Sequence, residues 1–434
     1  MGLSELKADN VGKEMYNLIA NLYPICRSIT GNGVRETLRR IQEFIPINIH
    51  EVPSEKKVFD WTVPKEWNIR DAYVKNAKGE RILDFKNSNL HVVGYSMPVK
   101  TKISLKELRE YLFTIPEHPD WIPYRTSYYK ETWGFCMTHK QFLELRDEEY
   151  EICIDSTLEN GYLTYGEYFL EGESTEEVLI SCHICHPSLC NDNLSGVALS
   201  TFLAKHLASH SRRYSFRFLF VPGTIGPIAW LASNKDSVRN IKHGLVVTGV
   251  GDPGPFTYKK SRQGNVEIDR VFGHVLKHSQ QEYKTIDFFP YGYDERQYCS
   301  PAFNLPVGCF MRTPHGEYPE YHTSEDNLDF VQPQYLEESY THCLNALTLL
   351  ERNKVFLNQN PHCEPQLGRR GLYRAIGGQA EGAKREMAML WALNLSDGHH
   401  SLLDIAERAS IPFEIVHEAV EALLGHGLLK EIVS

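Results

Sequence analysis

Two histidines, three cysteines and an aspartate are crowded into one short segment of the sequence. Between Leu179 and Gly196 the chain reads LISCHICHPSLCNDNLSG, an apolar run that enters a polar loop and then a helical pattern. Ligands bind at the carboxyl ends of parallel strands, which is where such a loop lies. Zinc takes imidazole and carboxylate ligands, and a catalytic site leaves one position for water. We therefore expect His186 and Asp192 to hold zinc, with His183 as the alternative histidine.

A second segment strengthens this expectation. His322 stands among acidic residues in a loop that follows the apolar run Val307 to Met311. A histidine in such a loop can also do no more than cap a strand end, and taken singly each of these histidines has that ordinary interpretation. The two segments together favour a zinc site built from His186 or His183, Asp192 and His322.

The elements that must position these residues alternate along the chain. Strand-like runs at 177–181, 215–222 and 243–248 are separated by helical patterns at 197–206 and 225–233. This alternation predicts an α/β fold with a mostly parallel sheet flanked by helices. Short alternating apolar runs from Pro46 to about Trp121 predict an inserted β-rich domain.

The C-terminal part has a different character. Helical patterns at 382–393, 401–406 and 412–424 precede a short strand at 428–433, which is the order of a winged helix. We expect three domains: 1–45 with 123–360 as the α/β domain, 46–122 as the insertion, and 361–434 as the winged helix.

Composition excludes several functions. The 434 residues carry a net charge of −10 with both signs interspersed, which argues against nucleic acid as the main substrate. The last winged-helix helix holds Glu414, Glu418 and Glu421, so we expect it to contact protein partners, with DNA unfavoured. No apolar stretch is long enough to cross a membrane, and Met1 to Leu18 reads as a polar amphipathic helix without the apolar core of a signal peptide. We expect a cytoplasmic protein and allow for a homo-oligomer.

The strand, the histidine-rich loop and the Asp-Asn-x-Ser-Gly sequence at 192–196 resemble the co-catalytic zinc aminopeptidases. In that family the aspartate bridges two zinc ions, a preceding histidine binds one of them, and a Tyr-His-Thr-x-x-Asp segment supplies another histidine. The resemblance implies ligand roles for Asp192, for His183 or His186, and for His322. The whole chain is similar to a bacterial group of aminopeptidase-like proteins with a β-rich insertion and a winged helix, in which 294–298 and 261–262 are further signatures.

The sequence departs from the aminopeptidases at one catalytic position. Where that family has a pair of glutamates, a general base and a metal ligand, this chain has Gly223 and Thr224. We therefore expect one zinc ion, a second one requiring other residues, and a base supplied by Asp294 or Glu295. The expected activity is hydrolysis of an amide in a small peptide, an N-acylated molecule or an amino-sugar derivative. Candidate substrate-binding residues are Arg262, Arg312 and Tyr321.

Two alternatives compete with the zinc hydrolase. Cys182, Cys185 and Cys190 could form a thiolate metal or redox site, since Cys182 and Cys185 have C-x-x-C spacing. Alternatively, the chain is a catalytically impaired peptidase-like protein that binds a ligand and uses its winged helix for partner contacts.

Overall fold

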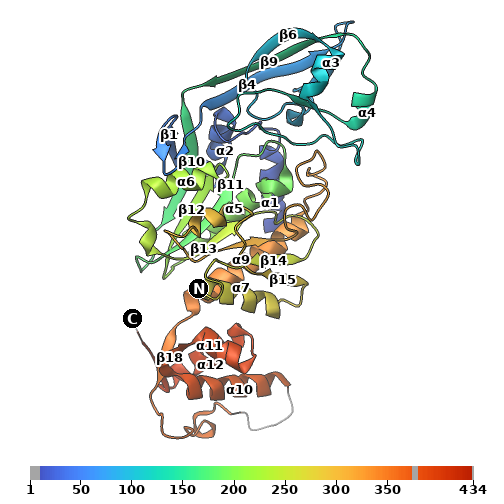
Figure 1. Cartoon of the computed structure of the whole chain (residues 1–434). Coiled ribbons are helices and arrows are strands. Elements are labelled where there is room, and N and C mark those ends of the chain that lie inside the picture. Colours follow the sequence, from blue (N-terminus) through green and yellow to red (C-terminus); the bar gives the residue numbers. More distant parts are fainter. Residues whose placement is uncertain (1–9, 374–379, 433–434) are drawn as a thin grey trace. The chain divides into compact units, whose positions relative to one another are not determined.

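The computed structural model describes residues 10–373 and 380–432, which divide into two compact units. The first unit comprises Met1–Val266 and Glu282–Thr341, and the second comprises Glu267–Gln281 and His342–Ser434 (Figure 1). The helix expected at the N-terminus is described from α1 (Val11–Leu22), and residues 1–9 lie outside the described part.

The first unit is built on an eight-stranded sheet with the order β1-β10-β12-β11-β13-β16-β14-β15. The central strands β12, β11, β13 and β16 run parallel to one another. The outer strands β1 and β10 are antiparallel to their inner neighbours, and β14 is antiparallel to β16. The strands are β1 (Asn48–Pro53), β10 (Tyr162–Leu170), β11 (Glu177–His183), β12 (Ser215–Val221), β13 (Ile241–Val247), β14 (Phe256–Lys259), β15 (Tyr283–Ile286) and β16 (Val307–Met311).

The sheet is therefore mixed, which corrects the expectation of a mostly parallel one. Only strands joined by crossover helices must run parallel. Strand β12 is reached from β11 through α5 (Gly196–Ala208), and β13 from β12 through α6 (Ile225–Ser233). Strand β10 instead follows the inserted strands directly, so its direction is not constrained in this way.

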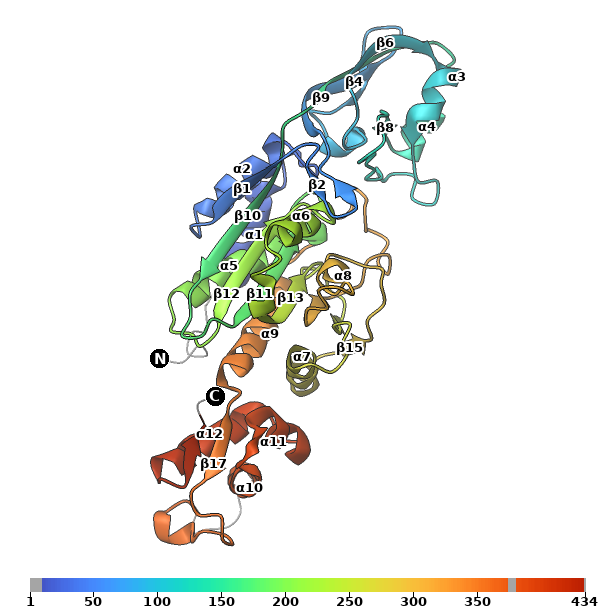
Figure 2. The same cartoon turned by 60° about the vertical axis from the view of Figure 1, so that its left-hand side comes forward.

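Helices cover the central strands. Every residue of β11 is buried, which requires cover on both faces of the sheet. Helix α5 packs on β11, β12 and β13 and also against α1, while α2 (Asn32–Gln42) and α6 pack on β10 (Figure 2). Helix α8 (Glu295–Tyr298) packs on β16, and α9 (Pro333–Arg352) continues from the first unit into the second.

The inserted segment forms its own four-stranded antiparallel sheet, β5-β4-β9-β6, with a separate apolar core. The predicted insertion spanned 46–122. In the structure, β1 lies inside that range but belongs to the main sheet, and β9 lies beyond it but belongs to the smaller sheet. Its elements are β2 (Lys57–Val58), β3 (Trp61–Thr62), β4 (Glu66–Lys75), β5 (Arg81–Asp84), β6 (Val99–Ser104), α3 (Leu105–Leu108), β7 (Leu112–Phe113), β8 (Phe135–Cys136), α4 (His139–Leu143) and β9 (Glu149–Glu159).

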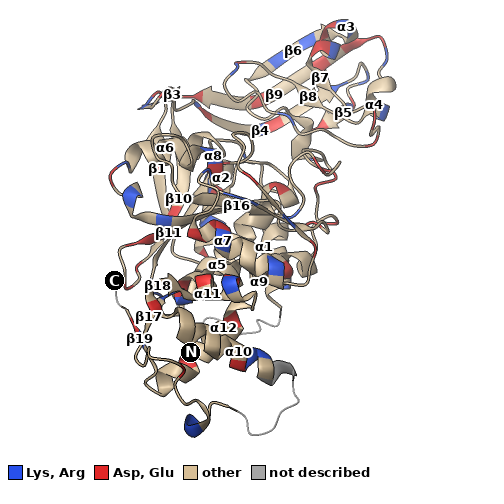
Figure 3. Cartoon of the chain, turned by 60° about the horizontal axis from the view of Figure 1, so that its bottom comes forward, with Lys and Arg blue, Asp and Glu red and all other residues tan. Residues whose placement is uncertain are grey.

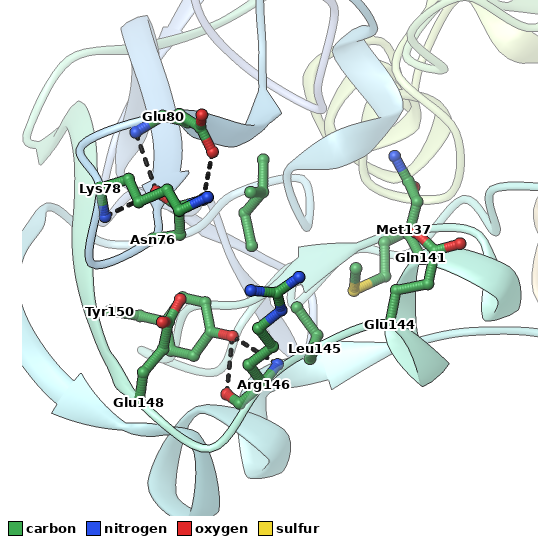
Figure 4. A pocket seen from close by; sticks show the side chains of 11 residues that line it. Asn76, Lys78, Glu80, Met137, Gln141, Glu144, Leu145, Arg146, Glu148 and Tyr150 are labelled. Atoms are coloured by element: carbon green, nitrogen blue, oxygen red, sulfur yellow. Dashed lines mark hydrogen bonds between the residues drawn. The ribbon is translucent and has the colours of Figure 1, made fainter.

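A pocket of about 310 Å³ lies within this insertion (Figure 4). Lys78, Arg146 and several glutamates line it. The hydrogen bonds in its walls join residues close in sequence: the Asn76 side chain donates to Glu80, and the Tyr150 hydroxyl donates to the Arg146 carbonyl. It contains no histidine or cysteine. The metal chemistry expected from the sequence therefore lies elsewhere.

The second unit has the predicted winged helix. Helices α10 (Ala380–Leu395), α11 (Leu402–Ala409) and α12 (Phe413–Gly425) accompany a sheet of β18 (Asp397–Ser401), β17 (Val355–Asn358) and β19 (Leu429–Glu431), and the unit also includes α7 (Glu267–His278). Basic and acidic residues are interspersed over the elements of both units (Figure 3). No described helix combines the length and the apolar character needed to cross a membrane.

Candidate metal centre

Asp192 lies at the centre of the candidate site, with three histidine rings around its carboxylate. Its Oδ1 atom is 2.8 Å from Nε2 of His183, and its Oδ2 atom is 2.9 Å from Nε2 of His322. Nδ1 of His186 is 3.6 Å from the same Oδ2 atom. One carboxylate thus joins histidines from two segments that are 130 residues apart in the sequence.

The strand end and the turn after it position the first two histidines and Asp192. His183 is the last residue of β11, and Asp192 belongs to the irregular turn η3 (Cys190–Ser195) that leads into α5. The Asp326 carboxylate accepts hydrogen bonds from the backbone N–H groups of Asn191, at 2.5 Å, and of Asp192, at 2.9 Å. These two bonds hold the turn in place, because its peptide groups would otherwise be buried without partners.

His322 is positioned by a backbone pairing with the end of the inserted segment. The N–H of Tyr124 donates to the His322 carbonyl at 2.8 Å, and Pro123 forms a bridge with Thr323. The Tyr124 ring meets the rings of His186 and His322 edge-on, with centroids 5.1 and 5.0 Å away. On the remaining side, the buried Arg27 donates from Nε to the His186 carbonyl at 2.9 Å.

The electrostatics of the cluster favour a charged carboxylate on Asp192 and a neutral ring on His186. Burial opposes the charge on Asp192, but His186 and His183 outweigh burial and hold the pKa of Asp192 well below its ordinary value. Burial lowers the pKa of His186 to about 3 against the opposing effect of Asp192, with further lowering by His183, His322 and Arg27, so this ring is neutral at pH 7. Burial also acts to lower the pKa of His183, but the adjacent Asp192 more than compensates and raises it. An ionised carboxylate and a neutral imidazole are the forms that bind metal.

These residues fit a zinc ion. One nitrogen or oxygen atom from each of His183, His186 and Asp192 lies within 4.8 Å of the others. Nδ1 of His186 is buried without a hydrogen-bond partner among the described residues, which is costly unless another group satisfies it. Histidine nitrogen and carboxylate oxygen are the ligand types that zinc prefers. His183, His186, Asp192 and His322 would hold the ion.

The cluster opens into a cavity of about 370 Å³. Asp294 lines this cavity. The N–H of Thr224, which follows the end of β12, donates to the Oδ1 atom of Asp294 at 2.7 Å. Its Oδ2 atom is buried without a partner among the described residues. Burial raises the pKa of Asp294 to about 6, although His183 and the Thr224 N–H act in the opposite direction. The carboxylate absent from positions 223 and 224 is therefore present in space, supplied by a segment that is 70 residues away in sequence.

Comparisons with known proteins show the family of the chain. A family model described as a domain of unknown function (DUF4910) matches residues 16–353. A protein of Clostridium acetobutylicum, named as a candidate polysaccharide biosynthesis protein with an aminopeptidase-like domain, is 55% identical over 423 residues, which are 98% of this chain and 97% of the relative.

The chain belongs to the DUF4910 family. A winged helix-turn-helix model matches residues 354–431, which confirms the predicted C-terminal fold. A crystal structure of a candidate peptidase from Clostridium acetobutylicum is 54% identical, covers 97% of this chain and 96% of its own, and has a TM-score of 0.93.

More distant structures include aminopeptidases. A zinc aminopeptidase of Bacillus subtilis has a TM-score of 0.56 at 11% identity, covering 79% of this chain and 95% of that enzyme. An aminopeptidase of an Aneurinibacillus strain has a TM-score of 0.51 at 12% identity, covering 78% and 93%. At such low identities the likeness shows the fold alone. The resemblance to zinc aminopeptidases expected from the sequence is confirmed at that level.

In this family member, Glu295 lies apart from the cavity. Its buried carboxylate is paired with Nζ of Lys259 at 2.7 Å, and the same Nζ donates to the Tyr291 carbonyl at 2.8 Å. Gly292 has a φ of 151°, a conformation that other residues rarely adopt, and a Cβ atom there would lie 2.7 Å from Oε1 of Glu295. Glu295 therefore supports the 291–293 loop that lines the cavity, and Asp294 is the acid that faces it.

Of the three candidate substrate-binding residues, one lines the cavity and two lie outside it. Tyr321 lines the cavity and stacks on His322 at 4.0 Å. Arg262 does not line it and donates to Asn304 at 2.8 Å. Arg312 is buried elsewhere, in an ion pair of 3.0 Å with Glu338. Neither arginine is available to a ligand in the cavity.

The cysteines of the motif do not form a thiolate cluster. Burial raises the pKa of Cys182 and of Cys185 to about 12 in each case, so both are neutral thiols. The thiol of Cys185 accepts a hydrogen bond from the Gly223 N–H at 3.3 Å and faces the cavity, whereas Cys182 is in the strand core. The histidine and aspartate cluster is the candidate metal-binding group that the described residues bring together.

Sequence reasoning overlooked two residues of the site. Asp326 was visible only as the last residue of the Tyr-His-Thr-x-x-Asp pattern, with no indication that it would hold the Asp192 turn. Arg296 stood in the 294–298 signature beside Asp294, and the structure places it in the cavity wall.

Proposed function

We propose that this protein is a zinc-dependent hydrolase that cleaves an amide bond in a small substrate. The observation that carries the proposal is the buried Asp192 carboxylate surrounded by three histidine rings, which line a cavity that also contains the Asp294 carboxylate. The aminopeptidase-like fold supports the same chemistry. One zinc ion is expected, because the described residues provide one cluster of ligand atoms.

The residues around the cavity can perform the proton transfers of amide hydrolysis. Zinc, when bound, acidifies a water molecule and polarises a carbonyl group. Asp294, with a pKa of about 6, is ionised at pH 7 and can accept the proton of that water. The same carboxyl group, once protonated, can give the proton to the departing nitrogen. The Thr224 N–H fixes one oxygen of Asp294 and leaves the unpartnered one for this exchange.

The substrate is proposed from the relative's name and from the cavity. Because the relative is named for polysaccharide biosynthesis, a saccharide is a candidate substrate. Among saccharides, N-acylated amino sugars carry an amide bond. A cavity of about 370 Å³ suits a small molecule of this kind or a short peptide. The acidic residues of α12 favour a protein partner over DNA for the winged helix.

A second candidate is a peptidase-like binding protein without hydrolytic activity. It is favoured by Gly223 and Thr224, which line the cavity where the resembling aminopeptidases have their glutamates. The distinction depends on whether Asp294 serves as a base in their place.

The test combines metal content with activity. We expect about one zinc ion per chain in wild-type protein equilibrated with zinc and dialysed, measured by mass spectrometry, and a loss of zinc in His322→Ala. His315→Ala is the matched control, because His315 contacts Tyr321 without lining the cavity. Zinc-loaded protein should hydrolyse members of a panel of N-acyl amino acids, N-acetyl amino sugars and dipeptides. Zinc binding without hydrolysis would favour the binding protein, and no zinc binding would refute both the metal centre and the hydrolase.

A further inference from the structure

One cation in the cavity wall has no assigned partner. Arg296 lines the cavity together with Asp294 and Tyr291. Its closest polar contact is a long one of 3.5 Å from Nη2 to the hydroxyl of Thr224, and its guanidinium lies 5.7 Å from the centre of the Tyr291 ring. Its Nε atom is buried and has no hydrogen-bond partner among the described residues. Within the described part of the chain, Arg296 forms no ion pair with any carboxylate.

Two carboxylates lie near this site. Asp192 is enclosed by the three histidines, and Asp294 is held at Oδ1 by the Thr224 N–H and interacts with Arg296 electrostatically without forming an ion pair with it among the described residues. Asp294 is the only carboxylate among the residues that line the cavity. A substrate with a free ammonium group would find no further acid there, and it would lie near Arg296.

The other walls are aromatic. Trp61, Tyr128, Tyr129, Tyr291, Tyr293 and Tyr321 line the cavity. Such rings bury apolar faces of a ligand, and the hydroxyl groups of tyrosine can donate hydrogen bonds to it. A planar guanidinium among them matches a carboxylate, which it can bind through two parallel hydrogen bonds.

We propose that Arg296 binds a carboxylate of the substrate, so that the preferred substrate is an N-acylated acid and not a peptide with a free amino terminus. The carboxylate lies at Arg296, the amide lies between the metal ligands and Asp294, and the body of the molecule packs on the tyrosines. This assignment rests on the proposed amide hydrolysis for its reaction, while the binding preference can be measured without turnover.

The test uses two sets of probes that differ in charge. One set is N-acetylmuramic acid, N-acetylglucosamine and glucosamine, which are anionic, neutral and cationic sugars. The other set is N-acetylphenylalanine, its carboxamide and phenylalaninamide. Binding to the zinc-equilibrated full chain is measured by calorimetry for wild type, Arg296→Gln and Arg296→Lys, and Arg40→Gln on the exposed side of α2 is the control. Zinc content and melting temperature show whether each variant is folded.

We expect the acid of at least one set to bind about 10-fold to 100-fold more tightly than its neutral counterpart, as for a charge-assisted hydrogen bond. The preference should vanish in Arg296→Gln, persist in part in Arg296→Lys and remain in Arg40→Gln. Where turnover is detected, Arg296→Gln should raise KM for the acid with a smaller change in kcat, and should leave the neutral substrate unaffected.

The outcomes separate the two proposals. Preferential binding of the acid through Arg296 without any hydrolysis would support this inference and count against the proposed function. Hydrolysis of acid and neutral probes with equal kcat/KM would support the hydrolase and overturn the role of Arg296. An acid that gains no affinity in either set, or that keeps its advantage in Arg296→Gln, overturns the inference.

Discussion

Replacing Asp294 by Asn should stabilise the metal-free protein at neutral pH. In the folded state, burial raises the pKa of Asp294 from its ordinary value of 3.8 to about 6. A shift of this size corresponds to about 3 kcal/mol of unfavourable free energy when the carboxyl is ionised, since one pKa unit corresponds to ~1.4 kcal/mol. Asparagine keeps an oxygen for the Thr224 N–H and carries no charge. We expect a gain of about 2–3 kcal/mol.

The pH dependence has a definite sign. Because the folded-state pKa of Asp294 lies above the unfolded-state value, wild-type stability associated with this group is fully present below about pH 4 and is lost as the pH rises through about 6. The variant does not lose it. The difference in the free energy of unfolding between variant and wild type should therefore grow between about pH 4 and 7 and then level off.

Urea denaturation at several pH values, in the presence of a chelator, measures this difference. Asp287→Asn makes the same chemical change on an exposed side chain and should have no comparable effect. Equal denaturant slopes for variant and wild type would support a comparison of midpoints. A difference that is absent, or that does not change with pH, would refute the assignment of a buried and reluctantly ionised Asp294. If Asp294 is the base, zinc-loaded Asp294→Asn should also lose activity by about 10²-fold or more while keeping its zinc.

Two further predictions concern residues that support the site. Asp326→Ala should lower zinc affinity by about 10–100-fold, because the N–H groups of Asn191 and Asp192 lose their acceptor. Competition with a chelating dye measures this affinity, and an unchanged value would show that the turn keeps its conformation without Asp326. Lys259→Met should lower the free energy of unfolding by about 3–5 kcal/mol, because it leaves Glu295 buried without its cation. The double variant Lys259→Met/Glu295→Gln should recover much of that loss in thermal unfolding, and no recovery would contradict an electrostatic cause.

The local patterns in the sequence were sufficient to point to the residues of the histidine and aspartate cluster and to the general architecture. His183 and Asp192 are nine residues apart, so a strand followed by a turn already brings them close. The alternation of strands and helices predicted the central parallel strands, and the helix order predicted the winged helix. Such patterns succeed because burial and periodicity act within a single element.

The directions of the outer strands were not accessible in the same way. Strand β10 leads into β11 through residues 171–176 with no crossover helix, so it runs antiparallel to β11 and therefore to β12, which is parallel to β11. The start of β9 at Glu149 lies beyond the predicted end of the insertion at 122. Strand pairing of this kind depends on contacts far apart in sequence, which a local pattern does not contain.

The two candidate acids show where the limit lies within the site itself. Asp294 and Glu295 are adjacent in sequence and both carry a carboxyl group, yet Asp294 faces the cavity and Glu295 is paired with Lys259. The choice depends on α8 starting at Glu295, which points the two side chains differently, and on Lys259 from β14 reaching only the second. The sequence also could not show whether another carboxylate stands near Gly223 and Thr224, because a carboxylate from a distant segment can occupy that place in the fold. A site can therefore keep its chemical groups while its motif is lost, and absence of the motif is not sufficient evidence that the chemistry is absent.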